Sequence, residues 1–386
     1  MYWHNMQLQR EVKNSTVLLT SANYFTIAKF RYSFISKLIA SGHKVVVYSS
    51  YDDMSHDSIK KIEGLGAICI KTGTGRGSYS VFEAIKYIVG YINILRKYSI
   101  DIAINFTLMP MFFGGIICRV NKLRFISVAT GLGSQYYGYF IKRWLLKFAY
   151  SLSIKHANQI WFVSQSDSKI GMDKLHLNPN KIKVVYGAGI KTRSNKNSLM
   201  DKISAKSKTQ IIYMGRIRKD KGIEDFIALA DQLSLDDRFS LALMGSMDSS
   251  DEYINALVNQ ASADGLFTRI DFNINNMQYL RSADVLLLCS KHEGMPTVIL
   301  ESMANFVIPI SANMPVIDEL NNMGARIYSY TSGNIESLHG KLIEIEDTTL
   351  DEREIILKNN HKFVSKYFDQ DAIANLQYGY FLELVE

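Results

Sequence analysis

The stretch 284-DVLLLCSKHEGMPTVILE-301 decides the fold class of this chain. Its first part, 284-DVLLLCS-290, is a short apolar run of the kind found in strands buried on both faces of a parallel sheet. A glycine-containing loop follows, and Pro296 and Thr297 suit the first turn of a helix. The order strand, loop, helix predicts an open α/β sheet, whose ligands bind at the carboxyl ends of the strands.

Two carboxylates, Glu293 and Glu301, frame this loop. The free N–H groups and the positive dipole of a helix start favour an anion such as a diphosphate. We expect Glu301 to accept hydrogen bonds from ribose hydroxyls and Glu293 to hold a hydroxyl of a bound sugar. The loop amides of Gly294, Met295 and Thr297 would then contact phosphate oxygens. Two glutamates alone also fit an ordinary loop and helix surface, but the strand–loop–helix order favours a ligand site.

A second candidate phosphate element is 215-GRIRKDKGIEDFIALA-230, which follows the predicted strand 210-QIIYMG-215. Gly215 permits a turn at the strand end. Arg216 and Lys221 are then predicted at the mouth of the ligand cleft, at the carboxyl ends of the strands and ahead of a helix that begins near Gly222. Two cations there would neutralise charge on a departing diphosphate, with Arg suited to bidentate contact and Lys acting as a point charge. An ordinary basic loop is the alternative.

The length of 386 residues exceeds the usual size of one hydrophobic core, so two domains are expected. We place an N-terminal domain at 1–190, a linker at 191–208 rich in Lys, Ser and Asn, and a C-terminal domain at 209–386, whose last helix returns to the first domain. A helix is expected over 30–41 and ends at Gly42. The predicted strands are 16–21, 43–49, 101–106, 124–130, 159–164 and 182–187, then 210–215, 240–245, 270–274, 284–290, 307–312 and 325–329.

Charge is divided unevenly between the two halves. Residues 1–190 carry 24 Lys and Arg against 9 Asp and Glu, a net charge of +15, whereas residues 209–386 carry a net charge of −13. The basic half favours an anionic partner, for which a membrane surface, a lipid diphosphate or a nucleic acid would qualify. The segment 139–157 reads as a core-packed helix, or alternatively as a helix lying on an anionic bilayer.

Several classes of protein and site are disfavoured. The N-terminal residues show no apolar secretory signal, and the three scattered cysteines indicate a reducing compartment with neither disulfides nor zinc. We expect no metal, because the acidic pair Asp369 and Asp371 fits helix capping better than ligation. No nucleic-acid motif is present. A dinucleotide-binding dehydrogenase is disfavoured, since no GxGxxG follows the first strand.

The C-terminal half resembles glycosyltransferase family 4, the retaining nucleotide-sugar transferases with the GT-B fold. The resemblance rests on 215-GRIRKDKG-222, 283-ADVLLLCSKHEGMPTVILESMA-304 and Glu319. The N-terminal half resembles bacterial members that act on polyprenyl-diphosphate-linked glycans, through 30-FRYSFISKLIASGHKVVV-47, 107-TLMPMFFGG-115 and 130-TGLGSQ-135. The fold implied is GT-B, with two Rossmann-like doubly wound domains facing an interdomain cleft.

The resemblance implies roles for individual residues. Glu293, Arg216 and Lys221 would be catalytic. Donor binding would involve Gly215, Arg216, Lys221, Gly294, Met295, Pro296, Thr297 and Glu301. Gly131, Gly133 and Asn105 would lie on the acceptor side.

The function implied is transfer of a hexose or N-acetylhexosamine, with retained anomeric configuration, from a nucleoside-diphosphate sugar, with UDP expected. The acceptor would be a polyprenyl-diphosphate-linked glycan in O-antigen or capsule synthesis. The partners implied are this donor, this acceptor and an anionic membrane surface, with no cofactor, metal or nucleic acid. We expect a cytoplasmic protein, peripheral at the inner face of the membrane. A GT-B-fold UDP-sugar epimerase is the alternative.

Overall fold

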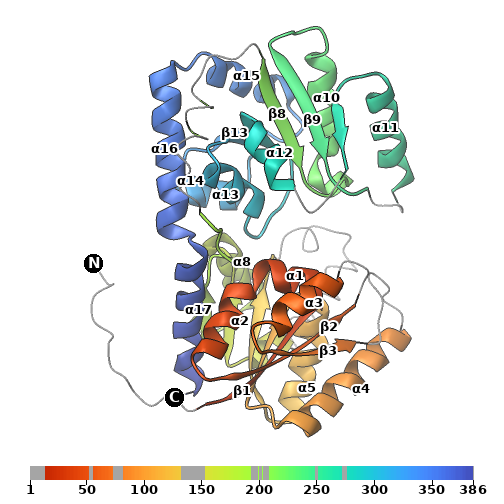
Figure 1. The fold of residues 1–386 in the computed structure, drawn as a ribbon, viewed down its shortest axis with the longest axis vertical. Coiled ribbons are helices and arrows are strands. Elements are labelled where there is room, and N and C mark those ends of the chain that lie inside the picture. Colours follow the sequence, from red (N-terminus) through yellow and green to blue (C-terminus); the bar gives the residue numbers. More distant parts are fainter. Residues whose placement is uncertain are drawn as a thin grey trace.

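The structure, a computed structural model, shows two α/β domains stacked along the long axis of the molecule (Figure 1). It describes residues 14–51, 55–72, 81–131, 153–192, 199, 202, 208–247, 251–271 and 276–385. Gly133, most of the segment 139–157 and most of the linker 191–208 lie outside the described residues.

The N-terminal domain is built on a seven-stranded parallel sheet with strand order β3-β2-β1-β4-β5-β6-β7. Its interior strands are almost wholly buried because helices cover both faces. The strands are β1 Thr16–Asn23, β2 Lys44–Ser50, β3 Ile68–Thr72, β4 Ile102–Phe106, β5 Arg124–Ala129, β6 Gln159–Phe162 and β7 Ile182–Val184. The helices are α1 Tyr24–Phe30, α2 Tyr32–Ala40, α3 Ser55–Glu63, α4 Val81–Tyr98, α5 Gly115–Val120 and α8 Gln165–Leu175, with a π-helical turn at Pro110–Gly114.

The C-terminal domain repeats this architecture with a six-stranded parallel sheet in the order β10-β9-β8-β11-β12-β13. The strands are β8 Thr209–Met214, β9 Phe239–Met244, β10 Thr268–Ile270, β11 Val285–Leu288, β12 Ile308–Ala312 and β13 Tyr328–Tyr330. The helices are α10 Ile223–Gln232, α11 Glu252–Ala263, α12 Asn276–Ser282, α13 Thr297–Ala304, α14 Pro315–Asn322, α15 Ile335–Glu346, α16 Leu350–Tyr367 and α17 Gln370–Val385. The predicted fold class, two parallel Rossmann-like domains, is confirmed.

Two local predictions need correction. The helix expected over 30–41 is α2 and begins two residues later, because Arg31 leaves helical geometry (φ −127°, ψ 1°) and separates it from α1, which was not predicted. The end of α2 at Gly42, in a left-handed conformation with φ 88°, is as expected. The strand β3 was not predicted. It lies at the sheet edge, is only partly buried and includes Lys71, so it lacks the apolar run that marks the interior strands.

The last helix, α17, returns to the N-terminal domain after α16 has packed along the C-terminal one (Figure 1). The chain passes between the domains twice, after Ile190 and again between α16 and α17, and these two segments are hydrogen-bonded to each other. Ile190 N–H donates to Phe368 O at 2.7 Å, and Gln370 N–H donates to Ile190 O at 3.1 Å. Gly189 adopts φ 71°, and a Cβ there would lie 2.6 Å from Gln370 Cα. The Asp369 carboxylate caps α17 by accepting from the main-chain N–H groups of Asp371 and Ala372, so the acidic motif serves the helix start.

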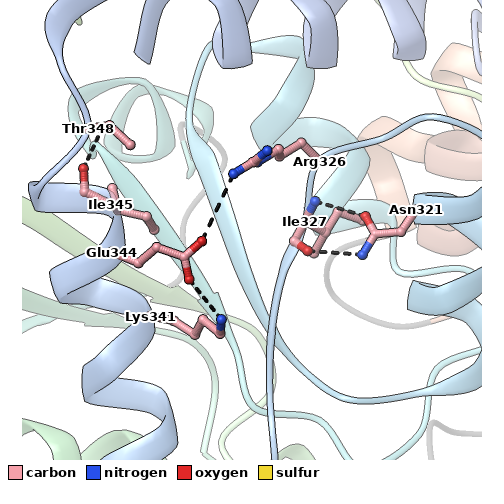
Figure 2. Close-up of polar contacts among 7 residues, drawn as sticks. All are labelled: Asn321, Arg326, Ile327, Lys341, Glu344, Ile345 and Thr348. Carbon is pink, nitrogen blue, oxygen red and sulfur yellow. Dashed lines mark hydrogen bonds and ion pairs between the residues drawn. The ribbon is translucent and has the colours of Figure 1, made fainter. Parts of the chain in front are cut away.

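Polar contacts fix the segment between α14 and β13 in the C-terminal domain, as Figure 2 shows. Asn321, near the end of α14, bonds the main chain of Ile327 in both directions, at 2.9 and 3.0 Å. Glu344 on α15 pairs with Lys341 at 2.8 Å and reaches Arg326 at 4.0 Å. These contacts secure the loop that joins α14 to β13.

Candidate donor site between the domains

Loops at the carboxyl ends of the two sheets meet between the domains. A Cβ added to Gly294, in the loop after β11, would lie 2.6 Å from Thr130 O and 2.8 Å from Gly131 Cα. Both of these residues follow β5 of the N-terminal domain. A side chain at Gly294 would push the loops apart, because backbone meets backbone here. The structure therefore brings together Gly131 and Gly294, which the sequence places on opposite sides of the cleft.

The loop between β8 and α10 is held next to the loop after β11. Gly222 has φ 65°, and a Cβ there would clash with the carbonyl of Cys289 at the end of β11. The buried Tyr213 hydroxyl donates to Arg216 O at 3.1 Å and to Lys221 O at 3.3 Å, so it ties down both ends of the basic turn. Burial raises the pKa of Tyr213 well above its ordinary value, which keeps the hydroxyl a donor.

Lys221 and Glu293 form the centre of the candidate site. Lys221 Nζ lies 2.6 Å from Glu293 Oε1, and the two side chains are only 15% and 21% exposed. Arg216, five residues earlier, is exposed and makes no ion pair with any residue that the structure describes. The ammonium thus neutralises Glu293 while the guanidinium is left facing solvent beside it.

The start of α13 supplies free main-chain donors on the other side of Glu293. Pro296 occupies the N-cap and, among the described residues, no side chain caps the helix. Since the first turn of a helix leaves its N–H groups unpaired, Thr297 and Val298 can donate to an anion. Met295 is buried and turns toward the N-terminal domain, where a Cβ on Gly187 would lie 3.4 Å from Met295 Cγ.

Glu301 lies on the next turn of α13, and its carboxyl side chain is 13% exposed. Burial raises the pKa of this carboxyl, and the nearby ammonium of Lys29 lowers it. Lys29 belongs to α1 of the N-terminal domain, and its Nζ lies 3.5 Å from Glu301 Oε1. No feature of the sequence around Lys29 signals this contact, because it depends on how the two domains pack.

A second contact between the domains was also absent from the sequence analysis. Glu319 on α14 accepts from the main-chain N–H groups of Gln165 and Ser166, both at 2.9 Å, in the first turn of α8. A carboxylate at a helix start is favoured by the helix dipole. Glu319 was quoted for the family resemblance, but its partner could be found only in the folded structure.

Asn105 does not lie where the sequence analysis placed it. The residue is fully buried in β4, where its Oδ1 accepts from Thr20 Oγ1 at 2.8 Å and from the Tyr91 hydroxyl at 3.0 Å. A Cβ on Gly114 would approach the same oxygen to 2.6 Å. The expectation that Asn105 faces an acceptor is therefore wrong, because the packing around it leaves no access from the cleft.

The described residues limit two other kinds of site. Within them, no helix combines the length and the apolar character needed to cross a bilayer. In the same part of the chain, no three His, Cys, Asp or Glu side chains gather as metal ligands would.

Comparisons with known proteins find glycosyltransferase relatives for both halves of the chain. Residues 195–363 match the family model of glycosyl transferases group 1, and residues 16–164 match that of glycosyl transferase 4-like proteins. No protein of curated function matches the sequence.

Solved structures share the fold along nearly the whole chain. A glycosyltransferase from Rickettsia africae is 16% identical with a TM-score of 0.74, and the match covers 97% of this chain and 99% of that one. HepE from Anabaena, solved with UDP-glucose, is 14% identical with a TM-score of 0.77 and coverages of 96% and 100%. WaaG, a glycosyltransferase of lipopolysaccharide biosynthesis, is 14% identical with a TM-score of 0.68 and coverages of 94% and 98%.

Proposed function

Since the chain is a glycosyltransferase of the GT-B fold, we propose that it moves a hexose or N-acetylhexosamine from a UDP-sugar to a lipid-linked glycan. The observation that carries the donor part is that Glu293, the uncapped start of α13 and Glu301 follow one another along one loop and helix, with Lys221 of the neighbouring loop paired to Glu293. This order matches the parts of a nucleotide sugar: phosphates at the cations and helix start, ribose at Glu301, sugar at Glu293. HepE, with the same fold, binds UDP-glucose, which supports UDP as the nucleotide.

The proposed reaction retains the anomeric configuration. The bond between the anomeric carbon and the diphosphate oxygen breaks, and Lys221 and Arg216 stabilise the charge that gathers on the leaving UDP. The acceptor hydroxyl attacks from the face that UDP leaves, and its proton passes to the departing phosphate oxygen. Glu293 orients the sugar through its hydroxyls, and the ion pair with Lys221 holds the carboxylate in place for that task. No metal is required in this scheme.

The donor site is tested by thermal unfolding with UDP, GDP, dTDP and CDP, on wild type and Glu301→Ala. A ligand that binds the folded state raises its apparent stability with concentration. We expect UDP to raise the melting temperature of wild type and to leave the melting temperature of Glu301→Ala unchanged. If no nucleotide acts on wild type, the donor assignment fails. UDP release that an added acceptor accelerates above the slow hydrolysis of the donor then distinguishes transfer from epimerisation.

The acceptor part of the proposal rests on the outer face of α4. Three apolar side chains at helical spacing, Phe82, Ile85 and Val89, are 78%, 52% and 51% exposed. Lys86, Arg96 and Lys97 are exposed on the same helix, which belongs to the basic half of the chain. Apolar residues flanked by cations suit the surface of an anionic bilayer, where a lipid-linked acceptor would reside. We propose peripheral binding at the cytoplasmic face of the membrane, in surface-polysaccharide synthesis such as O-antigen or capsule.

Vesicle co-sedimentation tests this surface. Wild type should sediment with vesicles containing phosphatidylglycerol and remain in solution with phosphatidylcholine alone. The double variant Ile85→Asp and Val89→Asp should lose the binding. Leu235→Asp is the matched control, since Leu235 is 98% exposed on the C-terminal domain. Equal loss in the control, or none in the α4 variant, would rule out this face.

A further inference from the structure

The ion pair between Lys29 and Glu301 joins the two domains at the candidate donor site. Lys29 lies in the last turn of α1, which follows β1 at the carboxyl edge of the N-terminal sheet. Glu301 lies on α13 of the other domain, and 3.5 Å separates Nζ from Oε1. A residue of the N-terminal domain thus contacts the carboxylate to which the proposed function assigns the ribose.

The Glu301 carboxyl group is buried, so its charge depends on the contact with Lys29. The carboxyl side chain is 13% exposed, whereas the Lys29 side chain is 41% exposed. A carboxylate removed from water is costly unless a cation or hydrogen-bond donors compensate. Among the described residues, no hydrogen bond to the Glu301 carboxylate other than that from Lys29 is present.

Among the residues that the structure describes, no second cation pairs with Glu301. Strands β11 and β12 carry only uncharged residues. Helix α16 brings His361, but its Nδ1 lies 3.0 Å from the Ala304 carbonyl at the far end of α13, and its ring stacks on Phe306. The nearby Asn305 amide donates to the main-chain oxygen of Glu301, not to its carboxylate.

We propose that Lys29 is a positioning residue of the donor site, which keeps the Glu301 carboxylate ionised and oriented for the two ribose hydroxyls. This inference rests on the proposed function. A carboxylate accepts from both hydroxyls, whereas a protonated carboxyl must use one oxygen as a donor. Because Lys29 comes from the other domain, nucleotide affinity depends on the two domains being in contact. Donor binding and domain arrangement are therefore coupled through one ion pair.

The test is the dissociation constant for UDP between pH 5 and 8, measured by calorimetry on wild type and variants. Lys29→Met should weaken UDP binding about fivefold at pH 7, the size of a partly exposed charge pair. The loss of affinity on acidification should also begin at a higher pH, because the carboxyl then protonates more readily. Lys29→Arg should restore both properties. Lys61→Met, which removes an exposed charge from α3 of the same domain, should behave as wild type.

The outcomes separate this inference from the proposed function. If Lys29→Met keeps the wild-type affinity and pH profile while Glu301→Gln loses UDP binding, Lys29 is only a surface contact and the inference is overturned. If Glu301→Gln also binds UDP as wild type does, the donor assignment itself fails. A weaker but pH-independent affinity in Lys29→Met would likewise overturn the role assigned to the ion pair. Melting temperatures without ligand verify that each variant is folded.

Discussion

Glu319 of the C-terminal domain caps Ser166 of the N-terminal domain, with 2.9 Å between its Oε2 and the Ser166 main-chain nitrogen. The second oxygen accepts from Gln165 N–H at the same distance, so one carboxylate serves two unpaired donors of α8. This contact lies between the domains and outside the loops of the donor site. It makes Glu319 a test of how firmly the two domains are joined.

Glu319→Ala should lower the free energy of unfolding by about 1–2 kcal/mol, the usual cost of losing a charged helix cap. Separation of the domains should also increase, measured as a larger radius of gyration by small-angle scattering. Glu319→Gln retains one accepting oxygen and should lose less. An unchanged radius with reduced stability would mean that the cap stabilises α8 alone.

Lys221→Met should reduce turnover by roughly 10²–10³-fold, because a preorganised charge on the leaving group is lost. Glu293 would also be left as a partly buried carboxylate without its cation. Slow hydrolysis of the UDP-sugar, followed as released UDP, measures this without an acceptor. Lys219→Met is the matched control, since Lys219 is 67% exposed in the same turn and, among the described residues, pairs only with Glu224, at 3.9 Å. Similar losses in both variants would argue against a specific role for Lys221.

Gly222→Ala should destabilise the C-terminal domain by about 3 kcal/mol or more, because a methyl group would clash with the Cys289 carbonyl. Gly265→Ala separates the steric clash from the strain of a positive φ. Gly265 also has a positive φ, of 75°, but no atom lies within 4 Å of an added Cβ. Backbone strain alone predicts about 1 kcal/mol for Gly265→Ala. Chemical denaturation of both variants measures the difference, and equal values would contradict the close packing of the two loops.

Stability should fall on acidification because of His43. Its Nδ1 accepts from Ser15 N–H at 3.2 Å, its ring packs on Phe381 of α17, and burial lowers its pKa. The unfolded chain therefore binds the proton more readily, so stability is complete above about pH 6.5 and declines as the pH falls below it. His43→Asn keeps an acceptor but does not titrate, and should flatten the melting temperature between pH 5 and 7. His56→Asn, on the exposed surface of α3, should show the same dependence of melting temperature on pH as wild type.

Strands in the sheet interiors could be predicted from the sequence because burial on both faces requires continuous apolar runs. The run before Glu293 became β11, and the run before Arg216 became β8, so the parallel sheet sets these loops side by side. The edge strand β3 could not be found in this way, since one side of it meets solvent. Helix α1 was not predicted, and α2 was started two residues early, because no glycine or proline marks the boundary at Arg31.

The parts of the candidate site that lie within one loop or helix were predictable, whereas those that need both domains were not. Glu293 and Lys221 follow neighbouring strands, so their meeting is a consequence of strand order. Lys29 is one of many lysines in the basic half, and only the packing of α1 against α13 distinguishes it. Asn105 shows the opposite error, because a polar residue at the end of a strand can serve the core instead of the cleft.

The return of α17 to the first domain has a consequence for how this protein is made. Phe381 belongs to the core beneath α2, together with residues of β1 and β2. During synthesis the N-terminal domain leaves the ribosome first, yet this core lacks a member until the second domain has been translated. Part of the apolar surface of the first domain therefore stays exposed to solvent while some two hundred further residues are translated. A chaperone that shields this apolar surface would therefore act longest on the N-terminal domain, which is synthesised first.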